Sequence, residues 1–294
     1  MLTVIGQAVV SGLAVGAVYA LAASGLGIIF GLFGVINFAH TQYLMLGAIA
    51  ALWLTMSGVP YIVAIAGGMA VAAIIGGLTE RLIIRPLIDN ESAQIDTLFV
   101  TLGLAIVIEN VTLLLWGSQP QYFNSPFSGV VQMGNIVLTG NRLFAIAVTA
   151  ATFVLLHLLS TRTRLGKAVV ATAQSPMAAR IIGISVEHVR FLAFVVGAGL
   201  AGLGGVLWGT IYSVSYITGG NFLIMSFVLV VMSGPGNIMG ILTCSLLLGM
   251  TESLTAAFVD PKWDRLAVML VFIIVIVRFP QGLFGEGRLA RSNI

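Results

Sequence analysis

Few side chains in this sequence are suited to chemistry, and two of the acidic ones lie inside long apolar runs. Glu109 and Glu252 are embedded in segments made largely of hydrophobic residues. A carboxylate inside a membrane is costly and by default suggests a function such as proton coupling. The alternative is a hydrogen-bonded carboxyl that fixes helix packing. We favour this alternative because neither run contains a Lys or Arg partner.

A second group of polar residues interrupts the apolar sequence between residues 36 and 43. It follows Gly34, and glycine permits a helix break whose freed backbone groups can line a polar cavity. One interpretation is a break that lines or gates a solute path, and the other is a turn in which Asn37 caps the next helix. The turn is the simpler interpretation for Asn37 itself, and both apply to the segment 213–221. The candidate path residues are Asn37, His40, Gln42, Tyr43, Tyr216 and Asn221.

The sequence offers no recognisable constellation for hydrolysis or metal binding. It has no Gly-x-Ser-x-Gly, no His-Glu-x-x-His and no glycine-rich nucleotide loop that ends in Lys-Ser or Lys-Thr. Its single cysteine, Cys244, excludes an internal disulfide and a multi-cysteine metal site. We therefore expect no enzyme, no metal site and no cofactor in this chain, so any ATP-hydrolysing motor must be another subunit.

The composition indicates that the bilayer is the solvent for most of the chain. Hydrophobic residues make up 59% and charged residues only 8%, with a mean hydropathy of +1.10. Ordinary soluble domains have about 45–50% apolar and about 25% charged residues. The first Asp, Glu, Lys or Arg is Glu80. The apolar stretch before Glu80 is far too long for a cleaved signal peptide, and it lacks the basic residues with which such a peptide begins.

Hydrophobic runs bounded by polar residues, Gly or Pro predict an all-α integral membrane protein with nine transmembrane helices. We expect a single membrane domain over residues 1–294, with 161–190 as a loop within it. A crossing needs about 20 mainly apolar residues, so the seventh and ninth runs are short and could be tilted or broken. The nine ranges are 4–30, 38–57, 60–79, 94–116, 142–160, 190–212, 221–233, 238–259 and 265–279.

Lys and Arg in short loops predict the orientation, because such loops remain in the cytoplasm. With nine crossings, ten of the 13 basic residues fall on one side, in 80–92, in 161–190 and in the tail that holds Arg278, Arg288 and Arg291. The other three are Arg142, Lys262 and Arg265. The N-terminus should therefore lie outside and the C-terminus in the cytoplasm.

Two short motifs suggest that the halves of the chain are related. Gly34-Val35-Ile36-Asn37-Phe38 resembles 219–222, and Gly77-Leu78-Thr79-Glu80-Arg81-Leu82 resembles 249–254. The predicted topology places the paired motifs on opposite faces of the membrane, which is typical of an inverted repeat in transporters. Spans 1–4 would correspond to spans 6–9, with span 5 as the linker.

The basic loop 161–190 predicts two short helices, one over 165–174 and one that follows it. Ser175 is a typical N-cap, Pro176 suits the first helical position, and Gly183 suits the left-handed position after the end. So short a helix needs a surface to pack on. That surface could be a cytoplasmic ATPase or the lipid headgroups. The candidate coupling residues are Ser175, Pro176, Met177, Ala178, Arg180, Ile181, Ile182 and Gly183.

Taken together, several runs resemble the permeases of high-affinity branched-chain amino acid ABC importers, specifically the shorter, first-type permease of the pair. The resemblance covers nearly the whole chain. The runs are Gly12-Leu13 through Tyr19-Ala20-Leu21, Ile36-Asn37-Phe38-Ala39-His40, Met45-Leu46-Gly47-Ala48, Thr163-Arg164-Leu165-Gly166-Lys167-Ala168, Ala173-Gln174, Ala178 to Ile184, Leu248-Gly249 through Glu252-Ser253, and Pro280-Gln281-Gly282-Leu283-Phe284-Gly285.

The resemblance implies a prokaryotic inner-membrane assembly in which this chain supplies half of a solute path. Its partners would be a second, similar permease, two cytoplasmic ATPases that bind ATP and Mg²⁺, and an extracytoplasmic solute-binding protein. The loop 161–190 aligns with the ATPase-coupling region of the family. Thr41, Val170 and Ser175 stand where the family usually has Gly, Arg and Asp, and these differences leave the solute open.

The substrate implied most directly is a branched-chain or other amino acid, and urea or a short amide is the nearest alternative. A third interpretation comes from another class of protein. In it the chain acts alone as an ion-coupled secondary transporter or a channel, and Glu109 and Glu252 carry protons or cations.

Overall fold

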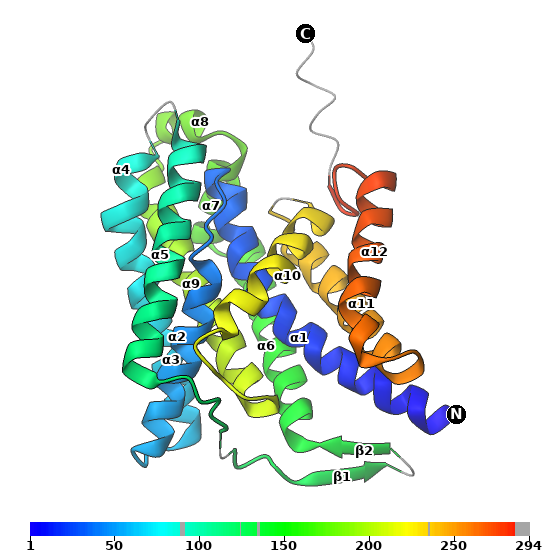
Figure 1. Cartoon of the computed structure of the whole chain (residues 1–294). Helices are drawn as coiled ribbons and strands as arrows, with labels where there is room; N and C mark the ends of the chain where they lie inside the picture. The colour runs from blue at the N-terminus through cyan, green and yellow to red at the C-terminus, as the bar shows by residue number, and fades with distance from the viewer. Residues whose placement is uncertain (89–91, 124, 134–135, 235, 286–294) are drawn as a thin grey trace.

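The computed structural model describes residues 1–88, 92–123, 125–133, 136–234 and 236–285, and helices form most of it (Figure 1). Each of the nine predicted apolar ranges coincides with a helix. These helices are α1 (Leu2–Phe33), α2 (His40–Met56), α3 (Tyr61–Thr79), α5 (Ala93–Trp116), α6 (Gly140–Arg162), α9 (Val186–Ile211), α10 (Thr218–Ser233), α11 (Ile238–Phe258) and α12 (Asp264–Arg278).

Helix length separates these nine helices into two groups. In the described part of the chain, six are long and apolar enough to cross a membrane: α1, α3, α5, α6, α9 and α11. The others have only 17, 16 and 15 residues and are α2, α10 and α12. The lengths therefore agree with the prediction that the seventh and ninth runs are short, and they add the second run to this group.

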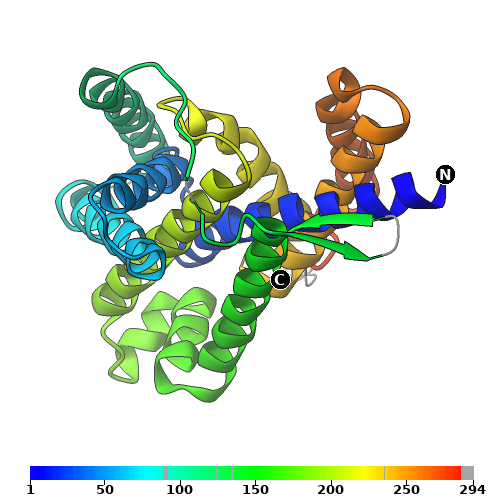
Figure 2. The ribbon, with the colours of Figure 1, turned by 90° about the horizontal axis from the view of Figure 1, so that it is seen from below.

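The outer surface of the bundle is apolar, as a protein in contact with lipid requires. On α5, Phe99 is 65% exposed and Leu114 is 83% exposed, and on α12 Ile274 is 67% exposed. Soluble monomers rarely expose large contiguous apolar patches. Figure 2 shows α5 and α12 on opposite sides of the central helices α1 and α9. The most exposed apolar helices are thus the outer ones.

Small residues allow the central helices to pack with their backbones almost touching. Gly12 of α1 lies against Gly249 of α11, and Gly25 of α1 lies against Gly197 of α9. A Cβ on Gly12 would stand 2.7 Å from the Cα of Met250, which is closer than such atoms can approach. Membrane helices associate through close van der Waals packing of this kind, because lipid provides no hydrophobic drive between them.

Three local elements were not predicted. A two-stranded antiparallel hairpin, β1 (Val130–Met133) and β2 (Ile136–Thr139), departs from the all-α expectation. The Gln7 side-chain amide joins it to α1, because its Nε2 donates to the Val137 carbonyl at 2.8 Å. The other two elements are a π-helical turn, η1 (Glu80–Ile84), and the one-turn helix α4 (Arg85–Leu87), which together lengthen α3.

The two ends of the bundle differ in their elements (Figure 1). α4, α7 (Arg164–Gln174) and α8 (Pro176–Ile181) lie at one end, while the N-terminus and the hairpin lie at the other. A 3-10 turn, η2 (Pro261–Trp263), precedes α12. Arg288 and Arg291, which belong to the predicted basic tail, lie outside the described residues.

Candidate functional site

The turn between α1 and α2 is fixed by backbone geometry and by a contact with α5. Gly34 ends α1 with a left-handed φ of 65°, a conformation that glycine adopts without strain. The Asn37 Oδ1 accepts a hydrogen bond from the Ala39 N–H at 3.0 Å, which closes an Asx-type turn just before α2. The N-cap of α2 is Ala39, and it has no side-chain cap bond. The Phe38 N–H donates to the Thr101 Oγ1 of α5 at 3.1 Å. Asn37 thus stabilises the turn before α2, but the expectation that it caps this helix is wrong.

The polar residues at the start of α2 are buried in this conformation. Asn37, His40, Gln42 and Tyr43 are at most 3% exposed. The His40 Nε2 lies 3.2 Å from the Ala22 carbonyl oxygen, and its ring packs edge-on against that of Tyr43 at 5.9 Å. Among the described residues, the His40 Nδ1, the Thr41 Oγ1 and the Gln42 Oε1 have no hydrogen-bond partner. Such atoms are unusual in a folded core and require an explanation.

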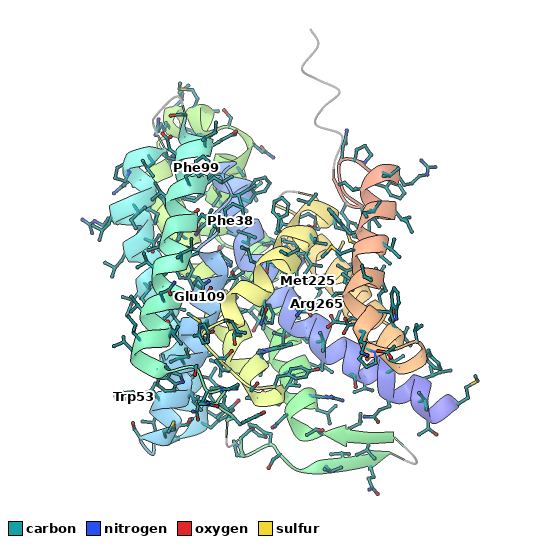
Figure 3. The ribbon with its side chains drawn as sticks, in the orientation of Figure 1. Phe38, Trp53, Phe99, Glu109, Met225 and Arg265 are labelled. Carbon is teal, nitrogen blue, oxygen red and sulfur yellow. The ribbon has the colours of Figure 1, made fainter. Side chains whose placement is uncertain are left out.

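The structure brings the two predicted path segments together where α2 meets α10. Gln42 lies directly against Gly219, so close that a Cβ on this glycine would overlap the side-chain oxygen. On α10, the next glycine faces Glu109, whose Oε2 would lie 3.5 Å from a Cβ on Gly220. Figure 3 shows Glu109 on α5 beside α10. Of the remaining candidates, Tyr216 is partly buried and Asn221 is exposed.

Glu252 lies in a contact between two central helices. The Tyr19 hydroxyl of α1 donates a hydrogen bond to the Glu252 Oε2 of α11 at 2.8 Å. The Tyr19 ring packs against Phe222 at 5.5 Å and against Trp208 at 6.5 Å. This geometry fits the interpretation of Glu252 as a carboxyl that fixes helix packing.

The predicted short helices of the basic loop are present, and the second of them has the predicted caps. The Thr163 Oγ1 accepts from the Gly166 N–H at 3.0 Å at the start of α7, and the Ser175 Oγ accepts from the Ala178 N–H at 3.2 Å at the start of α8. After α8, Gly183 has a φ of 85°. Its N–H and that of the following residue bond back into the last turn at 3.0 and 2.9 Å, which is the pattern of a Schellman motif.

α8 presents an apolar patch that no described residue covers. Met177, Ile181 and Ile182 are 69%, 79% and 72% exposed, and Ala178 is exposed beside them, whereas Ala179 faces inward at 1%. A six-residue helix with such a surface gains its stability by packing on something else. The structure therefore fits a docking element at this end of the bundle.

A cluster of charged residues beside α8 was not singled out from the sequence. It surrounds a cavity of about 40 Å³, and Glu80 there is only 2% exposed. The Arg180 Nη2 donates to the Glu187 Oε1 at 2.7 Å. The available signal was that Glu80 is the first charged residue after a long apolar stretch. The cavity-lining residues are Phe33, Glu80, Arg85, Ile88, Arg180, Glu187 and Arg190.

Comparison with known proteins gives a consistent picture. A family model described as "Branched-chain amino acid transport system / permease component" matches residues 8–277. The chain is 33% identical to the permease protein BraD of Pseudomonas aeruginosa and 29% identical to LivH of Escherichia coli, both described as parts of a high-affinity branched-chain amino acid transport system. Each match covers 95% of both chains. The fructose import permease protein FruG of Bifidobacterium longum is 24% identical over 78% of this chain and 70% of its own.

Proposed function

The chain belongs to the branched-chain amino acid transport permease family, and from this premise we propose that it forms half of the solute path of an ABC importer for branched-chain amino acids. It is a multi-pass membrane protein, and its relatives are transport components. The single observation that carries the proposal is the exposed apolar patch of α8 on an otherwise well-capped helix. In such an importer, the apolar patch of α8 would dock on a cytoplasmic ATPase.

The proposed topology has nine crossings, with the N-terminus outside and the C-terminus in the cytoplasm of a prokaryotic cell. The positions of the basic residues support it, because Arg81, Arg85 and the loop 161–190 lie at the end of the bundle that holds α8. Arg142 lies beside the hairpin at the opposite end. Short crossings by α2 and α10 are compatible with their burial between longer helices, where irregular ends are tolerated. The short outer helix α12 would cross where the bilayer thins locally or where Arg278 reaches the interface.

We also propose that the two halves form an inverted repeat. Helix packing supports it: α11 lies against α1 through Gly249, and α3 lies against α9 through Gly76 and Gly77. In the repeat, α1 corresponds to α9 and α3 corresponds to α11. The contact between α1 and α11 therefore has its counterpart in the contact between α9 and α3. The two related acidic residues, Glu80 and Glu252, lie in corresponding helices of the two halves. Repeats of this type usually meet near the solute path.

The path is proposed to pass the contact between α2 and α10. Asn221 is exposed and Tyr216 is partly buried, and Gln42 lies against Gly219. Asn37, His40 and Tyr43 are enclosed in the present conformation. Their neighbourhood includes buried polar atoms without partners, and rearrangement of the α1–α2 turn would allow water or solute to satisfy them. The present conformation would then be a closed one.

The assembly proposed for this chain contains a second permease, two ATPase subunits and an extracytoplasmic solute-binding protein. ATP and Mg²⁺ would be bound by the ATPase subunits. BraD and LivH, each matched over 95% of the chain, are both described as permeases for branched-chain amino acids, which favours that solute. Urea or a short amide is the alternative that the resemblance implies, and the more distant relative FruG is described as a fructose import permease.

Uptake into proteoliposomes that contain the complete assembly tests the proposed function. We expect accumulation of labelled leucine that requires ATP and survives a protonophore. Ile182→Asp should reduce uptake at least tenfold, because it places a charge in the docking patch, while Ile182→Val should retain it. Uptake that needs an ion gradient and ignores ATP would contradict the proposal, as would full activity in the Ile182→Asp variant.

A further inference from the structure

We propose that five charged residues beside α8 form a joint that transmits the displacement of α8 to the α1–α2 turn. This inference rests on the proposed function, in which α8 moves with an ATPase. We call these residues the charged joint: Glu80, Arg85, Arg180, Glu187 and Arg190. They act as positioning residues for the transport cycle.

The charged joint connects elements that are distant in the sequence. Its cavity of about 40 Å³ is bounded by η1 and α4, by α8, by the first turns of α9 and by the end of α1. In the described part of the chain this is where α8 shares a cavity with the central bundle. Movement of α8 must therefore either carry these elements along or separate the charges.

Glu80 is the buried centre of the joint. Its side chain is 2% exposed, and its Oε2 has no hydrogen-bond partner among the described residues. Arg85, Arg190 and Arg81 are the cations close enough to act on its charge. A buried carboxylate is tolerated when cations compensate it, and separating them leaves an uncompensated charge. Because Arg190 lies on α9 while Glu80, Arg81 and Arg85 lie on η1 and α4, the geometry penalises a movement of α9 that η1 and α4 do not follow.

The ion pair between Arg180 and Glu187 joins α8 to α9. Their side chains are in contact at 2.7 Å and are 50% and 44% exposed. A pair exposed to this degree contributes little to folding stability. The pair does hold the last turn of α8 close to the first turn of α9, so its role is to position these helices. Disrupting it should therefore alter coupling and leave the fold intact.

The contact between Arg190 and Phe33 carries the connection to the candidate path. The Arg190 guanidinium lies 5.5 Å from the centre of the Phe33 ring, a cation–π geometry. The same ring packs edge-on against Phe194 of α9 at 5.9 Å. Phe33 is the last residue of α1, and Gly34 begins the turn to the buried polar residues of α2. A displacement of α9 near Arg190 thus acts directly on that turn.

An anionic ligand, such as a lipid phosphate, is a less suitable occupant of this cavity. Its three guanidiniums already face two carboxylates, so little positive charge remains for a phosphate. The carboxylates of Glu80 and Glu187 already offset most of the positive charge around the cavity.

The test is a charge exchange in the complete assembly, reconstituted in proteoliposomes. Arg180→Glu and Glu187→Arg each replace the attraction by a repulsion. We expect each to lower uptake at least fivefold while ATP hydrolysis stays within twofold of wild type, so that more ATP is used per solute. The double variant restores the attraction and should return uptake to within twofold of wild type. Arg278→Glu makes the same charge change at the exposed end of α12, outside the loop 161–190, and should have little effect.

A second variant tests the buried member of the joint. Glu80→Gln keeps the shape of the side chain, and it should also raise the ATP used per solute, with normal elution of the complex in size-exclusion chromatography. Single variants with wild-type coupling, or a double variant no better than the singles, would overturn the joint. Absence of ATP-driven uptake by the wild-type assembly would instead count against the proposed function itself.

Discussion

At the scale of single residues, the hydrogen bond from Tyr19 to Glu252 gives a carboxyl in the apolar core a definite partner. The bond is 2.8 Å long and joins two helices that are far apart in the sequence. Sequence reasoning favoured a packing role for Glu252 but could not identify the partner, because a hydroxyl 233 positions away leaves no local pattern. The caps of Thr163 and Ser175 were accessible to prediction, since each bonds a backbone N–H three residues further on.

Tyr19→Phe should lower the stability of the purified protein modestly. It removes the hydroxyl but retains the ring that packs on Phe222. Interhelical hydrogen bonds in membrane proteins are worth about 0.6 to 1.7 kcal/mol. We therefore expect a fall of about 2–4 °C in the midpoint of thermal unfolding in detergent. Tyr122→Phe is the matched control, because Tyr122 is 74% exposed. Equal midpoints for the two variants would contradict the packing role of this bond.

At the scale of helices, their positions could be predicted well, whereas their contacts could not. Long apolar runs with polar or glycine boundaries located all nine helices. The hairpin was missed because each of its strands has only four residues in a sequence that is apolar almost throughout. The π-helical turn at Glu80 lies beside the charged joint, whose residues come from segments about 100 positions apart. Local periodicity does not contain that information.

Two glycines should respond to alanine in opposite ways. A Cβ on Gly205 of α9 would overlap the Leu44 carbonyl oxygen of α2, so the helices would have to separate. Overpacking of this kind costs about 1–3 kcal/mol. Gly103 on α5 has no atom within 4 Å of the added Cβ, and alanine there gains about 1 kcal/mol of helix propensity. Thermal unfolding in detergent should thus show a loss for Gly205→Ala and no loss for Gly103→Ala. A destabilised Gly103→Ala with an unaffected Gly205→Ala would contradict the observed contact.

At the scale of the whole molecule, the proposed docking helix and the proposed solute path lie in different parts of the fold. α8 and the charged joint lie at one end, and the contact between α2 and α10 lies deeper in the bundle. The helix that holds the candidate coupling residues could be predicted because it is one local element with its own caps. The surroundings of the candidate path residues could be predicted only in part, since the structure brings Gln42 against Gly219 but encloses His40 and Tyr43. Whether a polar residue is enclosed depends on packing between distant helices.

The docking of α8 on an ATPase subunit is tested most directly by photo-crosslinking from position 182 in the active assembly. A photoreactive amino acid replaces Ile182, which is 72% exposed, and a matched sample carries it in place of Leu114, which is 83% exposed on α5. We expect irradiation to join position 182, and not position 114, to the ATPase subunit. Exclusive labelling of lipid from position 182 in an assembly that is transporting solute would contradict the account.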